Sequence, residues 1–235
     1  MKSNKINKKR GIWNFGGNVA PNFVDHIIKS VPFYQSGHEI IKKSSDYFLK
    51  NNSVCYDLGS STSELLISLS QYTNKKIKFV GLDNEVKMVE YSKKLIKKKK
   101  IKDIQIKKTD ILKYQLKKSD LVISYYTMQF IDPKFRQIFL NKIYKSLNWG
   151  GGFFLFEKIR GDDARFQDIL TNLYHDFKED NGFSIKDIDS KAKSLRGVLE
   201  PFSDRGNIGL LKRAGFSDIQ TIFQYLNFKG YLCIK

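Results

Sequence analysis

Apolar residues along the chain fall into two kinds of run: short β-branched or aromatic runs, and longer stretches with helical spacing. The short runs lie at 54–58, 77–83, 104–107, 121–126 and 153–157, and each reads as a strand. Stretches of helical period separate most of them. Strands that alternate with helices are typical of a mainly parallel sheet with helices on both faces. The pattern therefore predicts an α/β fold.

The order of elements changes after the fifth strand. Residues 160–199 have helical patterns and no strand, and they are too many for a simple crossover, so we expect a helical insert at about 160–200. The insert would lie over the carboxyl edge of the sheet, where α/β proteins bind ligands. Two last runs, 219–225 and 228–234, are joined by a short turn and predict a terminal antiparallel hairpin.

The amino-terminal part divides into a tail and a cap. The basic tail at 1–10 is predicted to be disordered, and a helical cap is predicted over about 15–50. Within the cap, Pro32 should interrupt a helix because its ring removes a backbone N–H, and another helix is predicted at 38–49. A chain of 235 residues suits one α/β domain with a full core, here residues 11–235.

The stretch from Val54 to Glu64 reads as a strand, a tight turn and a helix. Gly59 in the turn lets a ligand approach the backbone closely because glycine has no Cβ atom. Ser61 stands three residues before Glu64, which is the spacing of a capping box and predicts a helix that starts at Ser61. The free N–H groups of that helix would point at the turn, where a carboxylate can bind.

A second acid follows at the separation that nucleotide-binding folds use. Asp83 ends the second strand roughly 20 residues after Gly59, from where a carboxylate can hold two ribose hydroxyls. The turn has Ser61 and Ser63 in place of the second and third glycines of a dinucleotide fingerprint. The sequence therefore favours an adenosyl ligand without a pyrophosphate, and S-adenosyl-L-methionine (SAM) fits that description.

Charge adds a possible nucleic-acid partner. The formal net charge is +18, but 35 of the 42 basic residues are Lys and only seven are Arg, the residue that phosphate and base recognition tends to favour. The densest run, 93–102, falls where a surface helix should end, and Lys is favourable there in any case. Two interpretations stay open: a solvated helix face and an RNA-facing patch.

The two cysteines, Cys55 and Cys233, lie in apolar strand-like runs and read as reduced core thiols without a disulfide. No zinc-ligand spacing recurs, so no metal is predicted. The amino terminus lacks an apolar signal core and no stretch is long enough to span a bilayer, so we expect no membrane association and a cytoplasmic protein.

Several separate stretches resemble one known family. They lie at 30–34, 56–61, 82–84 with Met88, 127–130, 142–144, 147–148, 157–158, 175–178, 181–182, 212–216 and 227–228. Together they span about residues 15–235 without large gaps. The chain resembles the class I SAM-dependent methyltransferases and, more closely, the carboxy-S-adenosyl-L-methionine (carboxy-SAM) synthase family, which serves wobble-uridine modification in tRNA.

The resemblance implies a Rossmann-like class I methyltransferase fold with a seven-stranded, mainly parallel sheet, a homodimer and SAM as the cofactor. It also implies roles for individual residues. Tyr34 would close over the sulfonium, and Asp57 and Met88 belong to the matching stretches around the cofactor. By the same resemblance, Gly59, Ser60 and Ser61 would line the methionine part of SAM, and Asp83 and Asn84 would hold its ribose and adenine. Asp110 and Ile111 would flank the adenine ring.

Two positions depart from the family pattern. The family contacts the extra carboxylate of its product through an asparagine and an arginine, and an alignment without gaps places Tyr125 and Ala192 there. A buried carboxylate left without its charged partner costs about 3–5 kcal/mol. Lys191, Lys193 and Arg196 stand nearby as substitutes, but lysine does not reproduce the bidentate geometry of arginine.

The sequence leads to three functional hypotheses. The first is SAM-dependent methyl transfer to an unidentified small-molecule or tRNA-related acceptor, with Tyr34, Tyr125 and His175 as candidate catalytic residues and Tyr125 next to the reacting methyl. The second is the family's own reaction, which places a carboxyl group from prephenate on the methyl carbon of SAM. The third is a non-catalytic SAM-dependent protein that binds RNA through its basic surface.

Overall fold

The computed structural model describes residues 20–235, and the tail predicted at 1–10 lies outside them. The α-helices are α1 Phe23–Ser30, α2 Tyr34–Ser44, α3 Glu64–Tyr72, α4 Val86–Lys98, α5 Pro133–Ser146, α6 Ala164–Asp180, α7 Ile185–Ser194 and α8 Asp204–Ala214. The strands are β1 Val54–Leu58, β2 Lys78–Asp83, β3 Ile104–Lys108, β4 Ser119–Tyr125, β5 Leu147–Lys158, β6 Asp218–Tyr225 and β7 Phe228–Ile234.

The seven strands form one sheet in the order β3-β2-β1-β4-β5-β7-β6. The strands from β1 to β5 pair in parallel, whereas β7 pairs antiparallel with both β5 and β6. This arrangement confirms the predicted Rossmann-like fold with a terminal antiparallel hairpin. The strand order reverses at β1 and β4, and that switch point is where α/β sheets bind ligands.

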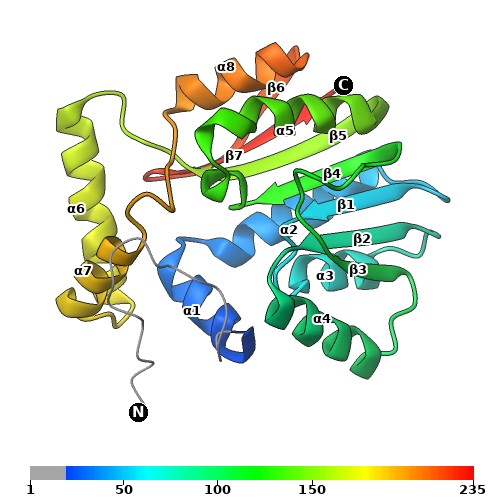
Figure 1. The fold of residues 1–235 in the computed structure, drawn as a ribbon, viewed down its shortest axis with the longest axis horizontal. Helices are drawn as coiled ribbons and strands as arrows, with labels where there is room; N and C mark the ends of the chain where they lie inside the picture. The colour runs from blue at the N-terminus through cyan, green and yellow to red at the C-terminus, as the bar shows by residue number, and fades with distance from the viewer. Residues whose placement is uncertain (1–19) are drawn as a thin grey trace.

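Helices cover both faces of the sheet (Figure 1). One apolar core contains Ile41 of α2, Leu66 of α3 and Val89 of α4. The other contains Leu140 of α5 and Leu211 of α8, together with buried side chains from the opposite face of the strands. Both cores are formed by strands whose side chains are buried on both sides, as a parallel sheet requires.

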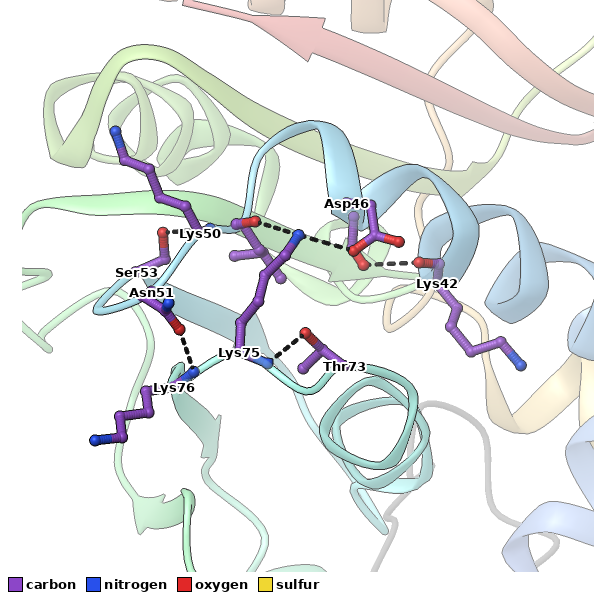
Figure 2. Close-up of polar contacts among 10 residues, drawn as sticks. Lys42, Asp46, Lys50, Asn51, Ser53, Thr73, Lys75 and Lys76 are labelled. Carbon is purple, nitrogen blue, oxygen red and sulfur yellow. Dashed lines mark hydrogen bonds and ion pairs between the residues drawn. The ribbon is translucent and has the colours of Figure 1, made fainter.

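The amino ends and the carboxyl ends of the strands, called here the amino and carboxyl edges of the sheet, have different surroundings. At the amino edge, polar contacts join the segments that lead into β1 and β2, as Figure 2 shows. Lys75 donates to Asp46 Oδ1 at 3.0 Å and to the carbonyl of Leu49 at 2.8 Å, and the Lys76 N–H donates to Asn51 Oδ1 at 2.8 Å. At the carboxyl edge, α1, α6 and α7 stand beyond the strand ends (Figure 1). The latter edge is therefore the covered one.

Two predicted boundaries change. Helix α2 runs from Tyr34 to Ser44, earlier than the predicted 38–49, because Phe33 takes a left-handed conformation directly after Pro32 and the helix begins at once. Strand β5 starts at Leu147, earlier than the predicted 153–157, since the residues before 153 pair with the chain end, where the Gly150 N–H donates to the Lys235 carbonyl. No helix within residues 20–235 is long and apolar enough to cross a membrane.

Candidate active site

A cavity of about 910 Å³ opens at the carboxyl edge, between the ends of β1, β2 and β4 and helices α1, α6 and α7. Every site residue predicted from the sequence lines it. These residues are Tyr34, Asp57, Gly59, Ser60, Ser61, Asp83, Asn84, Met88, Asp110, Ile111, Tyr125 and His175. The fold thus places around one cavity residues that are more than half the chain apart in sequence.

The turn after β1 is fixed by the end of β2. The N–H groups of Gly59 and Ser60 both donate to the Leu82 carbonyl, at 2.8 and 3.0 Å. The Ser61 N–H donates to Asp83 Oδ2 at 2.8 Å. The acid expected to hold the ribose therefore also holds the turn, which sets the distance between the two motifs.

The predicted capping box is wrong. Helix α3 begins at Glu64, and its N-cap is Ser63, which lies in the left-handed region with φ of 61° and makes no side-chain cap. The hydroxyl of Ser61 instead points to Met88 Sδ on α4, at 3.7 Å, while Ser92 Oγ donates to the Ser61 carbonyl at 2.7 Å. Contacts with α4 and with Asp83 therefore determine the conformation at Ser61, and the helix starts later.

Two glycines allow the turn to pack closely. Gly59 has φ of +86°, and a Cβ atom added there would lie 2.3 Å from Thr127 Oγ1. At Gly81 in β2, a Cβ atom would lie 2.7 Å from Ser60 Oγ. A side chain at either position would force the turn away from the strands, so glycine is required for this shape.

Two carboxylates, those of Asp57 and Asp83, lie at the end of the cavity next to the Gly59 turn, called here the acidic end. Asp57 is 3% exposed, and burial together with the nearby charge of Asp83 raises its pKa to about 7. Burial also raises the pKa of Asp83, which the backbone N–H groups of Glu85 and Ser61 oppose by donating to its oxygens. The negative field of these acids suits a ligand that carries a positive charge, such as a sulfonium or an ammonium group.

The residues here fit an adenosyl ligand with an amino-acid end. Each oxygen of Asp83 accepts one backbone N–H, which leaves its remaining lone pairs for the two ribose hydroxyls. The hydroxyl of Ser60, which lines the cavity, is buried without a partner among the described residues. Since buried polar groups are nearly always hydrogen-bonded, this hydroxyl indicates a polar ligand at the turn.

The neighbouring walls have the character of an adenine pocket. Met88 and Asn84 both line the cavity and come from the segment that follows β2. The side chain of Met88 is buried, and that of Asn84 is exposed. Opposite them, Asp110 Oδ1 accepts the Leu112 N–H at 2.8 Å, and this turn holds Ile111 at the cavity wall. An apolar thioether and an isoleucine beside polar groups provide both contact with a flat ring and hydrogen bonds to its edge.

Two tyrosines that contact each other line the cavity. Tyr125 lines the cavity, but its hydroxyl donates to the Tyr34 carbonyl at 2.6 Å and its ring packs 5.0 Å from that of Tyr34. The hydroxyl is thus engaged in attaching α2 to β4. Burial and the charges of Asp57 and Glu64 raise the pKa of Tyr34, so its phenol stays protonated.

The far end of the cavity is basic. Burial, followed by the charges of Lys178 and Arg160, lowers the pKa of Lys158 to about 7. Burial lowers the pKa of Lys178 to about 8, and burial with the charges of Lys178 and Lys158 lowers that of Lys191 to about 7. The three ammonium groups therefore lie near enough to repel one another.

The remaining predicted candidates divide between the cavity and the surface. His175 and Ala192 line the cavity, as does Arg196, whereas Lys193 pairs with Asp189 at 2.6 Å on the exposed side of α7. Burial and the charges of Lys178 and Lys158 lower the pKa of His175. Of the three basic residues proposed as substitutes near Ala192, two are thus placed at the cavity.

Sequence reasoning assigned no role to Lys158 or Lys178, although both belong to stretches that match the family. A signal was present: a charged residue directly after the buried run 153–157, at the carboxyl end of a central strand, is placed to face a ligand site. Among residues 20–235, no three His, Cys, Asp or Glu side chains gather as a metal site.

Comparison with known proteins agrees with this geometry. A family model described as a methyltransferase domain matches residues 49–200. An O-methyltransferase family protein from Burkholderia thailandensis has a TM-score of 0.66 at 12% identity, over 92% of this chain and 59% of that one. The YcgJ protein from Bacillus subtilis has a TM-score of 0.60 at 12% identity, over 81% and 72%. Fold and site define a SAM-dependent transferase of the class I methyltransferase type, with SAM as cofactor or substrate.

Relatives in sequence are more specific. Carboxy-S-adenosyl-L-methionine synthase from Staphylococcus epidermidis is 34% identical over 224 residues, which is 95% of this chain and 97% of the relative. The protein of that name from Campylobacter jejuni serotype O:6 is 37% identical over 95% of this chain and 94% of its own. The chain belongs to the carboxy-S-adenosyl-L-methionine synthase family.

Proposed function

We propose that this protein is a cytoplasmic carboxy-SAM synthase, which transfers a carboxyl group from prephenate to the methyl carbon of SAM for use in tRNA wobble-uridine modification. The observation that carries the proposal is the division of one cavity into an acidic end at Asp57 and Asp83 and a basic end at Lys158, Lys178 and Lys191. A cationic ligand and an anionic ligand can therefore meet in the same space.

The proposed reaction replaces a C–H bond of the methyl group with a C–C bond to the carboxyl carbon. The sulfonium makes the methyl C–H bonds acidic. Prephenate gives up carbon dioxide and hydroxide as its ring becomes aromatic, and the hydroxide leaves with the methyl proton as water, so phenylpyruvate remains. Because the donor supplies both the carboxyl group and the acceptor of the proton, the reaction needs no separate protein base.

The protein contributes placement and the exclusion of water. Asp83 and the Gly59 turn hold one reactant, and the basic end holds the carboxylates of the other. The aromatic side chains of Tyr34 and Tyr125 line the cavity and help to exclude water from the reacting carbons. Positioning two reactants in this way can supply much of the rate without an acid or a base.

The test is turnover. Purified protein is incubated with SAM and prephenate, and the products are identified by mass spectrometry. We expect carboxy-SAM and phenylpyruvate in equal amounts, and neither when one substrate is omitted. If the protein binds SAM but leaves both substrates unchanged, the proposed reaction is wrong.

Methyl transfer to an unidentified acceptor is the second candidate, and it is the one that the sequence favours. Its support is that Ala192 offers no charge and that the Tyr125 hydroxyl already donates to the Tyr34 carbonyl, so neither supplies the family's contacts with the product carboxylate. This candidate predicts that S-adenosylhomocysteine, and not carboxy-SAM, accumulates when a cell extract is supplied as a source of acceptors.

A non-catalytic RNA-binding role is the third candidate. The lysines at 97–100, which end α4 and follow it, are exposed and offer a positive surface. RNA affinity that falls steeply with salt would support this role, since each phosphate contact releases counterions. Binding that does not change between low and moderate salt would exclude it.

A homodimer is also part of the proposal. Phe166, Ile169 and Leu173 lie on one face of α6 and are 56%, 45% and 44% exposed. Apolar residues at this spacing form a stripe that a folded protein usually covers. Sedimentation velocity should therefore show a dimer, and Ile169→Asp should shift it toward the monomer; a wild-type monomer would contradict the assembly.

A further inference from the structure

The basic end of the cavity is assembled from three separate elements. Lys158 ends β5, Lys178 lies in α6 and Lys191 in α7. Lys178 is only 7% exposed. Within residues 20–235, neither Lys158 nor Lys178 forms an ion pair with a carboxylate. Buried lysines are rarely left without a counterion, and like charges close together repel, so this end favours an anion.

Tyr174 organises two of these lysines. Lys158 Nζ and Lys178 Nζ each lie 4.1 Å from the centroid of its ring. Its hydroxyl donates to the Ser30 carbonyl at 2.7 Å, at the carboxyl end of α1. The face of an aromatic ring attracts cations, and the hydrogen bond fixes the ring in place. The two ammonium groups are therefore held in position by contacts that leave their charge uncancelled.

Lys191 converges on the same point of α1. Its Nζ atom lies 3.2 Å from Ser30 Oγ and 2.6 Å from His26 Nε2. Burial and the charge of Lys191 lower the pKa of His26 to about 4, so the imidazole is neutral and accepts the hydrogen bond. Lys191 is thus attached to the end of α1 that also receives the Tyr174 hydroxyl.

Tyr126 supplies an independent sign of a missing ligand. This residue lines the cavity at the end of β4, is 7% exposed and has φ of 55°, in the left-handed region. Its hydroxyl is buried and has no hydrogen-bond partner in the described part of the chain. Its ring contacts Phe228 at 5.8 Å, and Phe228 also lies beside the ring of Tyr174, at 5.1 Å. The unused donor is thus on the same side as the lysines.

We propose that Lys158, Lys178 and Lys191, with the hydroxyl of Tyr126, form a carboxylate subsite that receives the carboxyl group of the second substrate and of the product. The inference rests on the proposed function. In this chain, where Ala192 stands at the family's arginine position, the positive charge at this end of the cavity comes from lysines of β5, α6 and α7.

The subsite is tested by comparing the dissociation constants of SAM and carboxy-SAM, measured by calorimetry. These two ligands differ only in the added carboxylate, so their ratio isolates it. We expect the wild type to bind carboxy-SAM at least about tenfold more tightly, as charge-assisted hydrogen bonds of this kind provide. Lys178→Met and Lys158→Met should remove most of that preference while SAM affinity stays within roughly twofold, since neither side chain reaches the acidic end.

Two further variants sharpen the test. Tyr126→Phe keeps the ring and removes only the hydroxyl, so it should lower the preference by about three- to tenfold without unfolding the protein. Lys186→Met is the matched control, because Lys186 is an exposed lysine of the same insert that does not line the cavity, and it should change nothing. Circular dichroism checks the fold of each variant.

The outcomes separate the subsite from the reaction. If the wild type prefers carboxy-SAM and the lysine variants keep that preference, the subsite is wrong even when prephenate is turned over. If the preference depends on the lysines but prephenate is not turned over, the subsite stands and the proposed reaction falls. A wild type that binds SAM and carboxy-SAM equally would overturn the subsite directly.

Discussion

The two ends of the cavity differ in charge and in how the chain builds them. The acidic end comes from consecutive strand–turn units, where Gly59 and Asp83 are joined through the Ser61 N–H. The basic end comes from Lys158, Lys178 and Lys191, which belong to separate elements and meet through Tyr174 and Ser30. We propose that the first end binds the adenosyl ligand and the second end the carboxylates of the other substrate.

The strongest test of the acidic end is Asp83→Ala. This change removes the acceptor for the ribose hydroxyls, and charged hydrogen bonds contribute about 1.5–3 kcal/mol each, so two of them amount to about 100-fold or more in affinity. SAM and carboxy-SAM should lose affinity equally, because the basic end is untouched. Calorimetry measures both.

Glu90→Ala is the control for that variant, since Glu90 is an exposed acid on α4. It should bind both ligands like the wild type. Unchanged SAM affinity in Asp83→Ala, with the fold intact by circular dichroism, would remove Asp83 from the binding site.

The next test concerns the close packing of the turn. Gly59→Ala and Gly182→Ala share the same backbone strain, since their φ angles are +86° and +85°, but only at Gly59 would the new Cβ atom meet another group. The left-handed conformation should cost about 1–2 kcal/mol in both variants. Contact with Thr127 should add about 1–3 kcal/mol at Gly59 and weaken SAM binding as well.

Urea unfolding of the two glycine variants, together with SAM titration, measures the difference. Equal losses of stability at both positions, with SAM affinity unchanged at Gly59, would show that the close approach of Thr127 does not shape the site.

The pH dependence of the ligand preference tests the basic end. The pKa values of Lys158 and Lys191 are lowered to about 7, so below this pH both hold their protons and the preference for carboxy-SAM over SAM should be full. As the pH rises, the free protein loses these protons first, and the preference should fall by up to about tenfold per pH unit for each lysine that must regain its proton. Carboxy-SAM binding above neutral pH should also take up protons.

Other titratable groups must be separated from this effect. The groups that line or adjoin the basic end are His26 from α1, Lys158 and Arg160 from the end of β5, Tyr174, His175 and Lys178 from α6, and Lys191 with Arg196 from α7 and the segment after it. Asp57, whose pKa is raised to about 7, acts on both ligands and cancels in their ratio. A ratio that stays constant from about pH 6 to pH 9 would contradict a role for the lysines.

The smallest effect is expected for Tyr125→Phe. The hydroxyl donates to the Tyr34 carbonyl, so its removal should lower stability by about 1–2 kcal/mol and leave the ratio of ligand affinities unchanged. Thermal unfolding and calorimetry check both. A large change in that ratio would instead place Tyr125 in direct contact with the added carboxylate.

The sequence predicts the acidic end because its information is local. The run 54–58 with Gly59, and the run 77–83 with Asp83, each fix a strand and the residue at its end, and parallel pairing then brings those ends together. Ser61 shows the limit of such reasoning, since its contacts with Met88 and Asp83 come from elsewhere in the chain and delay the helix that its spacing with Glu64 predicts.

The sequence predicts only part of the basic end. Lys191 is among the basic residues noted near Ala192, but Lys158 and Lys178 are distant from it in sequence and share no spacing with it. A helical pattern at 160–199 indicates helices but not how they turn toward Lys158. The contacts of the Tyr174 ring with Lys158 and Lys178 depend on where α6 lies relative to β5 and α1, and no periodicity encodes that position. Tyr126 is similarly hidden, since its unused hydroxyl becomes visible only when its surroundings are known.

A crystal structure of the protein with carboxy-SAM tests the central claim most directly. We expect the ribose on Asp83 and the added carboxylate in contact with Lys178 and at least one of Lys158 and Lys191, with the Tyr126 hydroxyl donating to it. A carboxylate that points away from these lysines, with the adenosyl group still on Asp83, would contradict the division of the cavity into two ends of opposite charge.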